Sequence, residues 1–97
     1  MGDKGLSPSD NTRVVPLHSS ARQGHSEVCK FLLENGSEKN PRDDLGFTPL
    51  HSAAQNGHVE VIKLLASYVE NKNPLDNIGR TPFTILSNYL LNNVFNP

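Results

Sequence analysis

Four histidines are the residues of this chain whose type and spacing could bind a metal ion. They form two pairs, His18 with His25 and His51 with His58, and the members of each pair are seven residues apart. A structural zinc site needs a complete set of histidine, cysteine or carboxylate ligands around one ion. No cysteine pair or carboxylate cluster accompanies either pair of histidines. We therefore expect structural roles for the histidines and no metal site.

Cys29 is the only cysteine of the chain and its strongest candidate nucleophile. Nucleophilic catalysis also needs a base and a group that orients it. Cys29 stands where Ile62 stands 33 residues later, on the apolar side of an expected helix, so we interpret it as a small core residue. A lone cysteine cannot form an internal disulfide, and it indicates a reducing compartment. No glycine-rich phosphate loop is present either, and we expect no catalytic residues, no enzymatic activity and no cofactor.

A period of 33 residues organises the chain around these side chains. The tripeptide Pro16-Leu17-His18 returns as Pro49-Leu50-His51 and, altered, as Pro82-Phe83-Thr84. When residues 10–42 are aligned with residues 43–75, 15 of the 33 positions are identical. Self-similarity at this period is the mark of stacked supersecondary units, each of which buries only the faces it shares with its neighbours.

Each unit is predicted to contain two helices and a projecting loop. Thr48 can cap a helix that begins with Pro49, because a proline loses no hydrogen bond in the first turn. Gly57 ends this helix, and a second begins near Val59; the first unit repeats the pattern over about 16–23 and 26–34. The segments 43–46 and 76–79 have the composition of tight turns.

The motifs of the middle unit closely resemble the ankyrin-repeat family. The residues that carry the resemblance are Thr48-Pro49-Leu50-His51-Ser52-Ala53-Ala54, then Gly57-His58, then Glu60-Val61-Ile62-Lys63-Leu64-Leu65. The resemblance covers about residues 10–97. It implies an all-α fold, an ankyrin-repeat solenoid of about two and a half helix-turn-helix repeats with projecting hairpin-like loops.

The resemblance also implies roles for several polar side chains. His51 would bond the Thr48 hydroxyl and a nearby backbone carbonyl, and the histidine of each Gly-His pair would support the turn between helices. Asn40 and Asn73 recur in the loops. They would bond backbone across the hairpin, and they are candidates for hydroxylation by the oxygen-dependent asparaginyl hydroxylase that acts on animal members of the family.

The departures from the family pattern suggest where the array is irregular. Arg13 and Val15 replace glycine and threonine in the first repeat, and Val69 stands where the family ends its second helix with glycine, so that turn should follow another path.

We expect a disordered leader over 1–9 and an ankyrin-repeat domain over 10–97, with repeats at about 10–42, 43–75 and an incomplete 76–97. The third repeat lacks the Gly-His pair and should end within its second helix. Its face is apolar, which indicates a fragment of a larger scaffold or an end that packs on something else; it carries Phe83, Ile85, Leu86, Leu90, Leu91, Val94 and Phe95.

Charge and hydropathy exclude two classes of partner. The formal net charge is -1 and no block of lysine and arginine occurs, so nucleic acid is not expected. No apolar stretch is long enough to span a bilayer and no secretory signal is recognisable, so no membrane association is expected. The expected location is cytoplasmic or nuclear.

Residues that vary between the repeats are the candidates for contact with a partner, because the shared residues hold the fold. They fall at the loop tips and at the ends of the first helices: Val14, Arg22, Gln23, Arg42, Asp44, Leu45, Phe47, Gln55, Asn56, Leu75, Asn77, Ile78, Arg80, Asn88 and Tyr89. Leu45, Leu75 and Ile78 either bind a partner or pack between adjacent loops. Phe47 and Tyr89 are the expected main contacts, and Phe47→Ala is expected to weaken binding without loss of stability.

The sequence therefore predicts a non-enzymatic module that binds another protein through its loop tips and concave inner-helix surface. The alternative is a structural role, in which the apolar face of residues 82–97 mediates self-association.

Overall fold

The computed structural model describes residues 13–93, and within that range the chain is all helical. The helices are α1 (Pro16–Gln23), α2 (Ser26–Glu34), α3 (Pro49–Gln55), α4 (Val59–Ala66) and α5 (Pro82–Asn93). The expected leader over 1–9, and Val94 and Phe95, lie outside the described residues. The predicted all-α class and the predicted helices of the first two repeats are confirmed.

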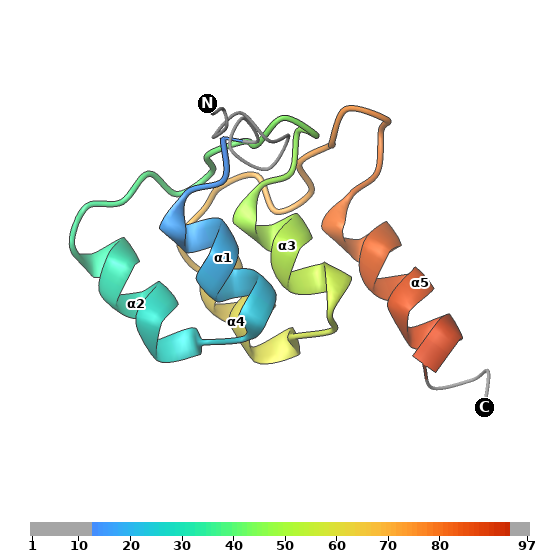
Figure 1. Ribbon diagram of the computed structural model, residues 1–97, viewed down its shortest axis with the longest axis horizontal. Helices are drawn as coiled ribbons and strands as arrows, with labels where there is room; N and C mark the ends of the chain where they lie inside the picture. The colour runs from blue at the N-terminus through green and yellow to red at the C-terminus, as the bar shows by residue number, and fades with distance from the viewer. Residues whose placement is uncertain (1–12, 94–97) are drawn as a thin grey trace, which may run out of the picture.

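The helices form two rows (Figure 1). The inner helices α1, α3 and α5 lie side by side, and the outer helices α2 and α4 pack against each other and against α1 and α3, respectively. Each of α1 and α3 is followed by a tight turn and then by its outer helix. Gly24 and Gly57 make these turns at φ 79° and 71°, a region that glycine enters without steric cost.

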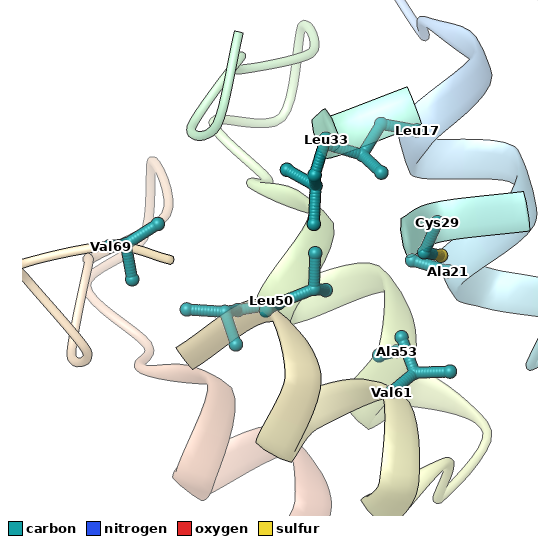
Figure 2. Close-up of a cluster of buried hydrophobic side chains, with 9 residues drawn as sticks. Leu17, Ala21, Cys29, Leu33, Leu50, Ala53, Val61 and Val69 are labelled. Atoms are coloured by element: carbon teal, nitrogen blue, oxygen red, sulfur yellow. The ribbon is translucent and has the colours of Figure 1, made fainter. Parts of the chain in front are cut away.

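The largest core lies between the first two repeats (Figure 2). Its nine buried residues come from α1 to α4 and the segment that follows: Leu17, Ala21, Cys29, Leu33, Leu50, Ala53, Val61, Leu65 and Val69. The burial of Cys29 confirms its interpretation as a core residue. A second, smaller cluster joins α3 to α5 and consists of Phe47, Ala54 and Ile85.

The third repeat differs from the sequence-based expectation of a second helix. The helix α5 runs without interruption from Pro82 to Asn93, and Leu90 and Leu91 continue it at the place of the Gly-His turn. Leucine is a strong helix former, and no glycine is present there to reverse the chain. A single longer helix therefore replaces the first helix and turn of the other repeats.

Two of the sequence departures have clear structural outcomes. Arg13 adopts φ 60°, the left-handed region that Gly46 and Gly79 occupy at the equivalent positions of the next repeats. Val69 avoids positive φ, as predicted: the chain turns earlier, after Ser67, and Val69 is buried in the larger core. The end of α2 follows the family pattern, with Gly36 at φ 91°.

Candidate functional site

The inner helices border a groove with two adjoining hollows that share Arg22 and Gln55. The larger, of about 470 Å³, lies between α3 and α5; its other lining residues are Asn56, Arg80, Ile85, Asn88, Tyr89, Asn92 and Asn93. The smaller, of about 310 Å³, lies between α1 and α3; its other lining residues are Val14, His18, Ser19, Gln23, Asp43, Leu45, Phe47 and Ser52. Ten of the fifteen predicted contact residues line the groove; the other five, Arg42, Asp44, Leu75, Asn77 and Ile78, lie in the loops beside it.

Aliphatic side chains at the loop tips face solvent. Leu45 is 62 % exposed, Ile78 is 75 % exposed, and Leu75 is also exposed. Their exposure shows that these side chains do not pack between the loops and leaves them accessible to a partner. Single exposed aliphatics are ordinary, but two at the same repeat position on adjacent loops make a patch beside the groove.

Polar contacts connect the loop that carries Leu45 to the loop that carries Ile78, and so position these exposed aliphatic side chains. The Arg42 guanidinium donates hydrogen bonds to the carbonyl oxygens of Gly46 at 2.9 Å and Leu75 at 2.6 Å. The Asn77 side chain donates to the Asp44 carbonyl at 2.9 Å. Arg42 and Asn77, predicted as contact residues, therefore also connect one loop to the next.

An aspartate carboxylate, buried at Asp76 and partly buried at Asp43, holds each loop in its turn. One Asp76 oxygen accepts hydrogen bonds from the N–H groups of Ile78 and Arg80, and the other accepts one from the Arg80 guanidinium at 2.8 Å. Burial favours the protonated carboxyl, but these hydrogen bonds outweigh it and lower the pKa of Asp76. Asp43 accepts two backbone N–H groups in the equivalent way.

The predicted exposure of Phe47 is wrong. Phe47 is 3 % exposed, stacks on His51 with ring centroids 5.2 Å apart, and lies under the Arg80 guanidinium at 5.5 Å. Its equivalent in the first repeat, Val14, is exposed. The position varies because its neighbours vary: in a stack, Arg80 of the third repeat covers Phe47 of the second.

Tyr89 packs within the fold and also lines the groove. A Cβ atom added to Gly57 would overlap the Tyr89 ring, so the ring lies directly on the turn between α3 and α4. In the preceding repeat the His58 ring lies on Gly24 in the same way, at 2.6 Å from a Cβ added there. Tyr89 remains partly exposed and borders the larger hollow.

A sequence model of ankyrin repeats in three copies matches residues 17–89, about three quarters of the chain. The chain belongs to the ankyrin-repeat family. Ankyrin repeats generally serve as modules for protein–protein interaction. No curated protein shows significant similarity to the chain.

The ankyrin histidines make the two kinds of contact that the resemblance implied, and the carbonyl that each one bonds belongs to the next repeat. The Nδ1 atom of His51 accepts the Thr48 N–H at 3.1 Å and lies 3.0 Å from the Thr48 hydroxyl, while its Nε2–H donates to the Arg80 carbonyl at 2.9 Å. Burial lowers the pKa of His51, against a smaller opposing effect of the Arg80 carbonyl. His18 bonds the Val15 N–H and the Phe47 carbonyl in the same geometry, without a hydroxyl.

The remaining chemical candidates fit the repeat architecture as well. Burial raises the pKa of the Cys29 thiol, whose sulfur lies 3.4 Å from the Ser20 hydroxyl. Within residues 13–93 no three metal-ligating side chains gather, and no helix there is long and apolar enough to cross a membrane. The loop asparagine Asn40 departs from the expected bonding, because its buried Oδ1 atom has no hydrogen-bond partner.

Asn92 and Asn93 line the larger hollow, and the sequence-based prediction missed them. The signal was available in the segment 82–93, which contains no residue that would end a helix after Pro82. In a continuous helix Asn92 lies one turn after Asn88 on the same face.

Proposed function

We propose that this ankyrin-repeat chain binds another protein through the loop tips and the groove of the inner helices, and that it is not an enzyme. The observation that carries the proposal is the combination of an open polar groove with exposed Leu45 and Ile78 beside it. Protein interfaces commonly combine an apolar patch and an aromatic residue with arginine and a polar rim. Here Tyr89 supplies the aromatic residue and Arg22 the arginine.

The proposal includes a cytoplasmic or nuclear location, and it includes neither nucleic acid nor membrane as a partner. Its contact residues are those predicted from the sequence, apart from the buried Phe47. Arg42, Asn77 and Arg80 would act partly by holding the loops in place.

A pull-down with matched variants tests the surface. The double variant Leu45→Ser/Ile78→Ser removes the apolar patch, while Phe31→Ser removes one exposed apolar side chain from the outer helix α2. We expect the patch variant to lose its captured protein and Phe31→Ser to keep it, both remaining folded by circular dichroism. Capture that survives the patch variant and fails with Phe31→Ser would place the interface on the outer helices instead.

Self-association through residues 82–97 is the second candidate. On α5, Phe83 is 70 % exposed and Leu91 is exposed, and residues eight apart share one helix face, here the face opposite Ile85 and Tyr89. Light scattering over a range of concentrations tests this candidate. A dimer that Phe83→Ser/Leu91→Ser converts to a monomer supports it, and a monomer at every concentration rejects it.

Hydroxylation of Asn40 and Asn73 is a further proposal that follows from family membership. Asn73 is exposed, whereas Asn40 is partly buried, so Asn73 should be the better substrate. Peptide mass spectrometry of protein purified from its source would detect the added oxygen atom, and its absence from both peptides rejects the proposal.

A further inference from the structure

We propose that the groove selects an extended, acidic peptide segment of its partner, with a carboxylate of that segment bound at Arg22. This inference rests on the proposed function and names the chemistry of the partner. It follows from the distribution of charge and amide groups over the inner helices.

The inner helices carry no acidic side chain. Of the described carboxylates, Glu27, Glu34 and Glu60 lie on the outer helices α2 and α4, and the others lie in loops. Arg22 is the one charged residue on α1, α3 and α5 within residues 13–93. The loop residue Asp43 also lines the smaller hollow, where its carboxylate accepts two backbone N–H groups, so Arg22 is the charge that the inner helices themselves bring to the groove.

Arg22 lies where the two hollows meet, since it lines both of them. Arg80 also lines the larger hollow, but its guanidinium already pairs with Asp76 at 2.8 Å. Among the described residues Arg22 has no ion pair. A guanidinium presents a planar fork of donors that fits a carboxylate, and within residues 13–93 no carboxylate pairs with this one.

Amide side chains surround Arg22. Gln55, Asn88 and Asn92 line the larger hollow, and Gln23 lines the smaller one beside Gln55. A side-chain amide offers both donors and an acceptor, so it can pair with the N–H and C=O groups of a peptide backbone regardless of sequence. The backbone of an extended segment has these groups free, whereas a helix uses them internally.

The length of the groove sets the length of the segment. Packed helices lie about 8–10 Å apart, so a path across α1, α3 and α5 spans roughly 20 Å. At about 3.3 Å per residue, an extended segment of roughly six residues covers this path.

The Asn56 side chain keeps Arg22 and the end of α3 in a fixed relation, because its amide donates to the Arg22 carbonyl at 3.0 Å. A simpler role for Arg22 is stabilisation of the C-terminal end of α1, where a cation is favourable. That role would make Arg22 matter for stability and not for binding, and the experiment separates the two.

Selection from a displayed library of random peptides, each about twice the roughly six-residue extended length of the path, on the immobilised full chain tests the inference. We expect the selected peptides to share an aspartate or glutamate. A selected peptide is then labelled, and its affinity is measured by fluorescence anisotropy for the wild type, Arg22→Gln, Arg22→Lys and Lys63→Gln. Lys63 is exposed on the outer helix α4, so Lys63→Gln changes the net charge equally but away from the groove.

Arg22→Gln should weaken binding about tenfold or more, as expected for loss of a charged hydrogen-bonded partner. Lys63→Gln should change binding less than about twofold, and Arg22→Lys should retain part of the affinity. Replacing the peptide's acidic residue by its amide should weaken binding to the wild type about as much as Arg22→Gln does. The same replacement should leave binding to Arg22→Gln unchanged, which is the mark of a direct pair.

Selected peptides without an acidic residue, or equal affinity of the wild type and Arg22→Gln, would overturn the inference. So would a failure to select any peptide, or an Arg22→Gln effect confined to the melting temperature. The proposed function is judged separately, because a folded partner captured in a manner sensitive to Leu45→Ser/Ile78→Ser supports it in each of these cases.

Discussion

The two junctions between successive repeats use the same backbone contacts but different amounts of packing. At the first junction His18 donates to the Phe47 carbonyl at 2.8 Å, and at the second His51 donates to the Arg80 carbonyl at 2.9 Å. At each junction an aromatic or imidazole ring also lies on the glycine of the preceding turn. The histidine-to-carbonyl hydrogen bonds therefore repeat with the period of the sequence, whereas the ring on the turn comes from His58 at the first junction and from Tyr89 at the second.

The packing does not repeat. The first junction places two helices on two and buries the nine-residue core, whereas the second places α5 on α3 around Phe47, Ala54 and Ile85. The free energy of a repeat stack is approximately a sum of repeat and junction contributions. The second junction should therefore be the weaker one, and it should depend on a few side chains.

Phe47→Ala should have the largest effect on stability. Truncation of a buried phenylalanine costs about 3–5 kcal/mol, and here it also removes the support under His51 and Arg80. Urea unfolding followed by circular dichroism measures the loss. The matched control is Leu45→Ala on the same loop, an exposed residue whose change should stay within about 0.5 kcal/mol. Equal midpoints for the two variants would show that the second junction does not depend on Phe47.

The helix α5 should open before the rest of the stack. Local opening begins where few apolar contacts hold an element, and α5 has one inner helix beside it. We expect its backbone amides to exchange with deuterium roughly 100-fold faster than those of α3, a difference of about 2.7 kcal/mol. If residues 82–93 were instead the best-protected segment, the second junction would be the more stable of the two.

Gly57→Ala should cost more than Gly36→Ala. Both glycines have positive φ, which costs a residue with a Cβ atom about 1–3 kcal/mol. A Cβ on Gly57 also meets the Tyr89 ring, whereas nothing lies within 4 Å of one on Gly36. We expect about 1 kcal/mol of extra loss for Gly57→Ala, and Tyr89→Ala should relieve that part in the double variant. A strictly additive double variant would mean that the ring moves aside freely.

His51→Ala should destabilise the chain more than His18→Ala, by about the 1 kcal/mol of one intramolecular hydrogen bond. His51 has the Thr48 hydroxyl as a neighbour, while His18 has Val15 at the corresponding position. Thermal or urea unfolding of the two variants measures the difference. Thr48→Val is the control, because without the hydroxyl the stability lost on His51→Ala should approach the loss on His18→Ala. Identical unfolding midpoints for His51→Ala and His18→Ala would contradict the assignment.

The smallest expected effect is a dependence on pH from His51. Its pKa is lowered in the fold from 6.5, so below that pH the unfolded chain binds more protons and stability falls. Melting temperatures from about pH 7.5 to about pH 5 should decline in the wild type and decline less in His51→Gln, which does not titrate. The lowered pKa of Asp76 acts in a separate window, where stability is lost as the pH falls below 3.8. Parallel pH profiles for the wild type and His51→Gln would exclude His51 as the source.

The sequence alone determined the features that depend on local interactions. Helix starts at Pro16 and Pro49, left-handed turns at Gly24 and Gly57, and the burial of Cys29 follow from residue types that recur every 33 positions. These features repeat because each is completed within one repeat, or by a backbone group that every following repeat supplies. The groove was predicted in the same way, from the positions that vary.

Only the tertiary structure decided which of the repeated positions are covered. Val28 and Val61 are identical residues at equivalent positions, yet Val28 is 47 % exposed and Val61 is 1 % exposed. Phe47, predicted to be a binding residue, is buried, and Tyr89 takes over the packing that His58 provides one repeat earlier. The physical reason is that the environment of a side chain in a stack comes from the neighbouring repeats, so the same position can be core in one repeat and surface in another.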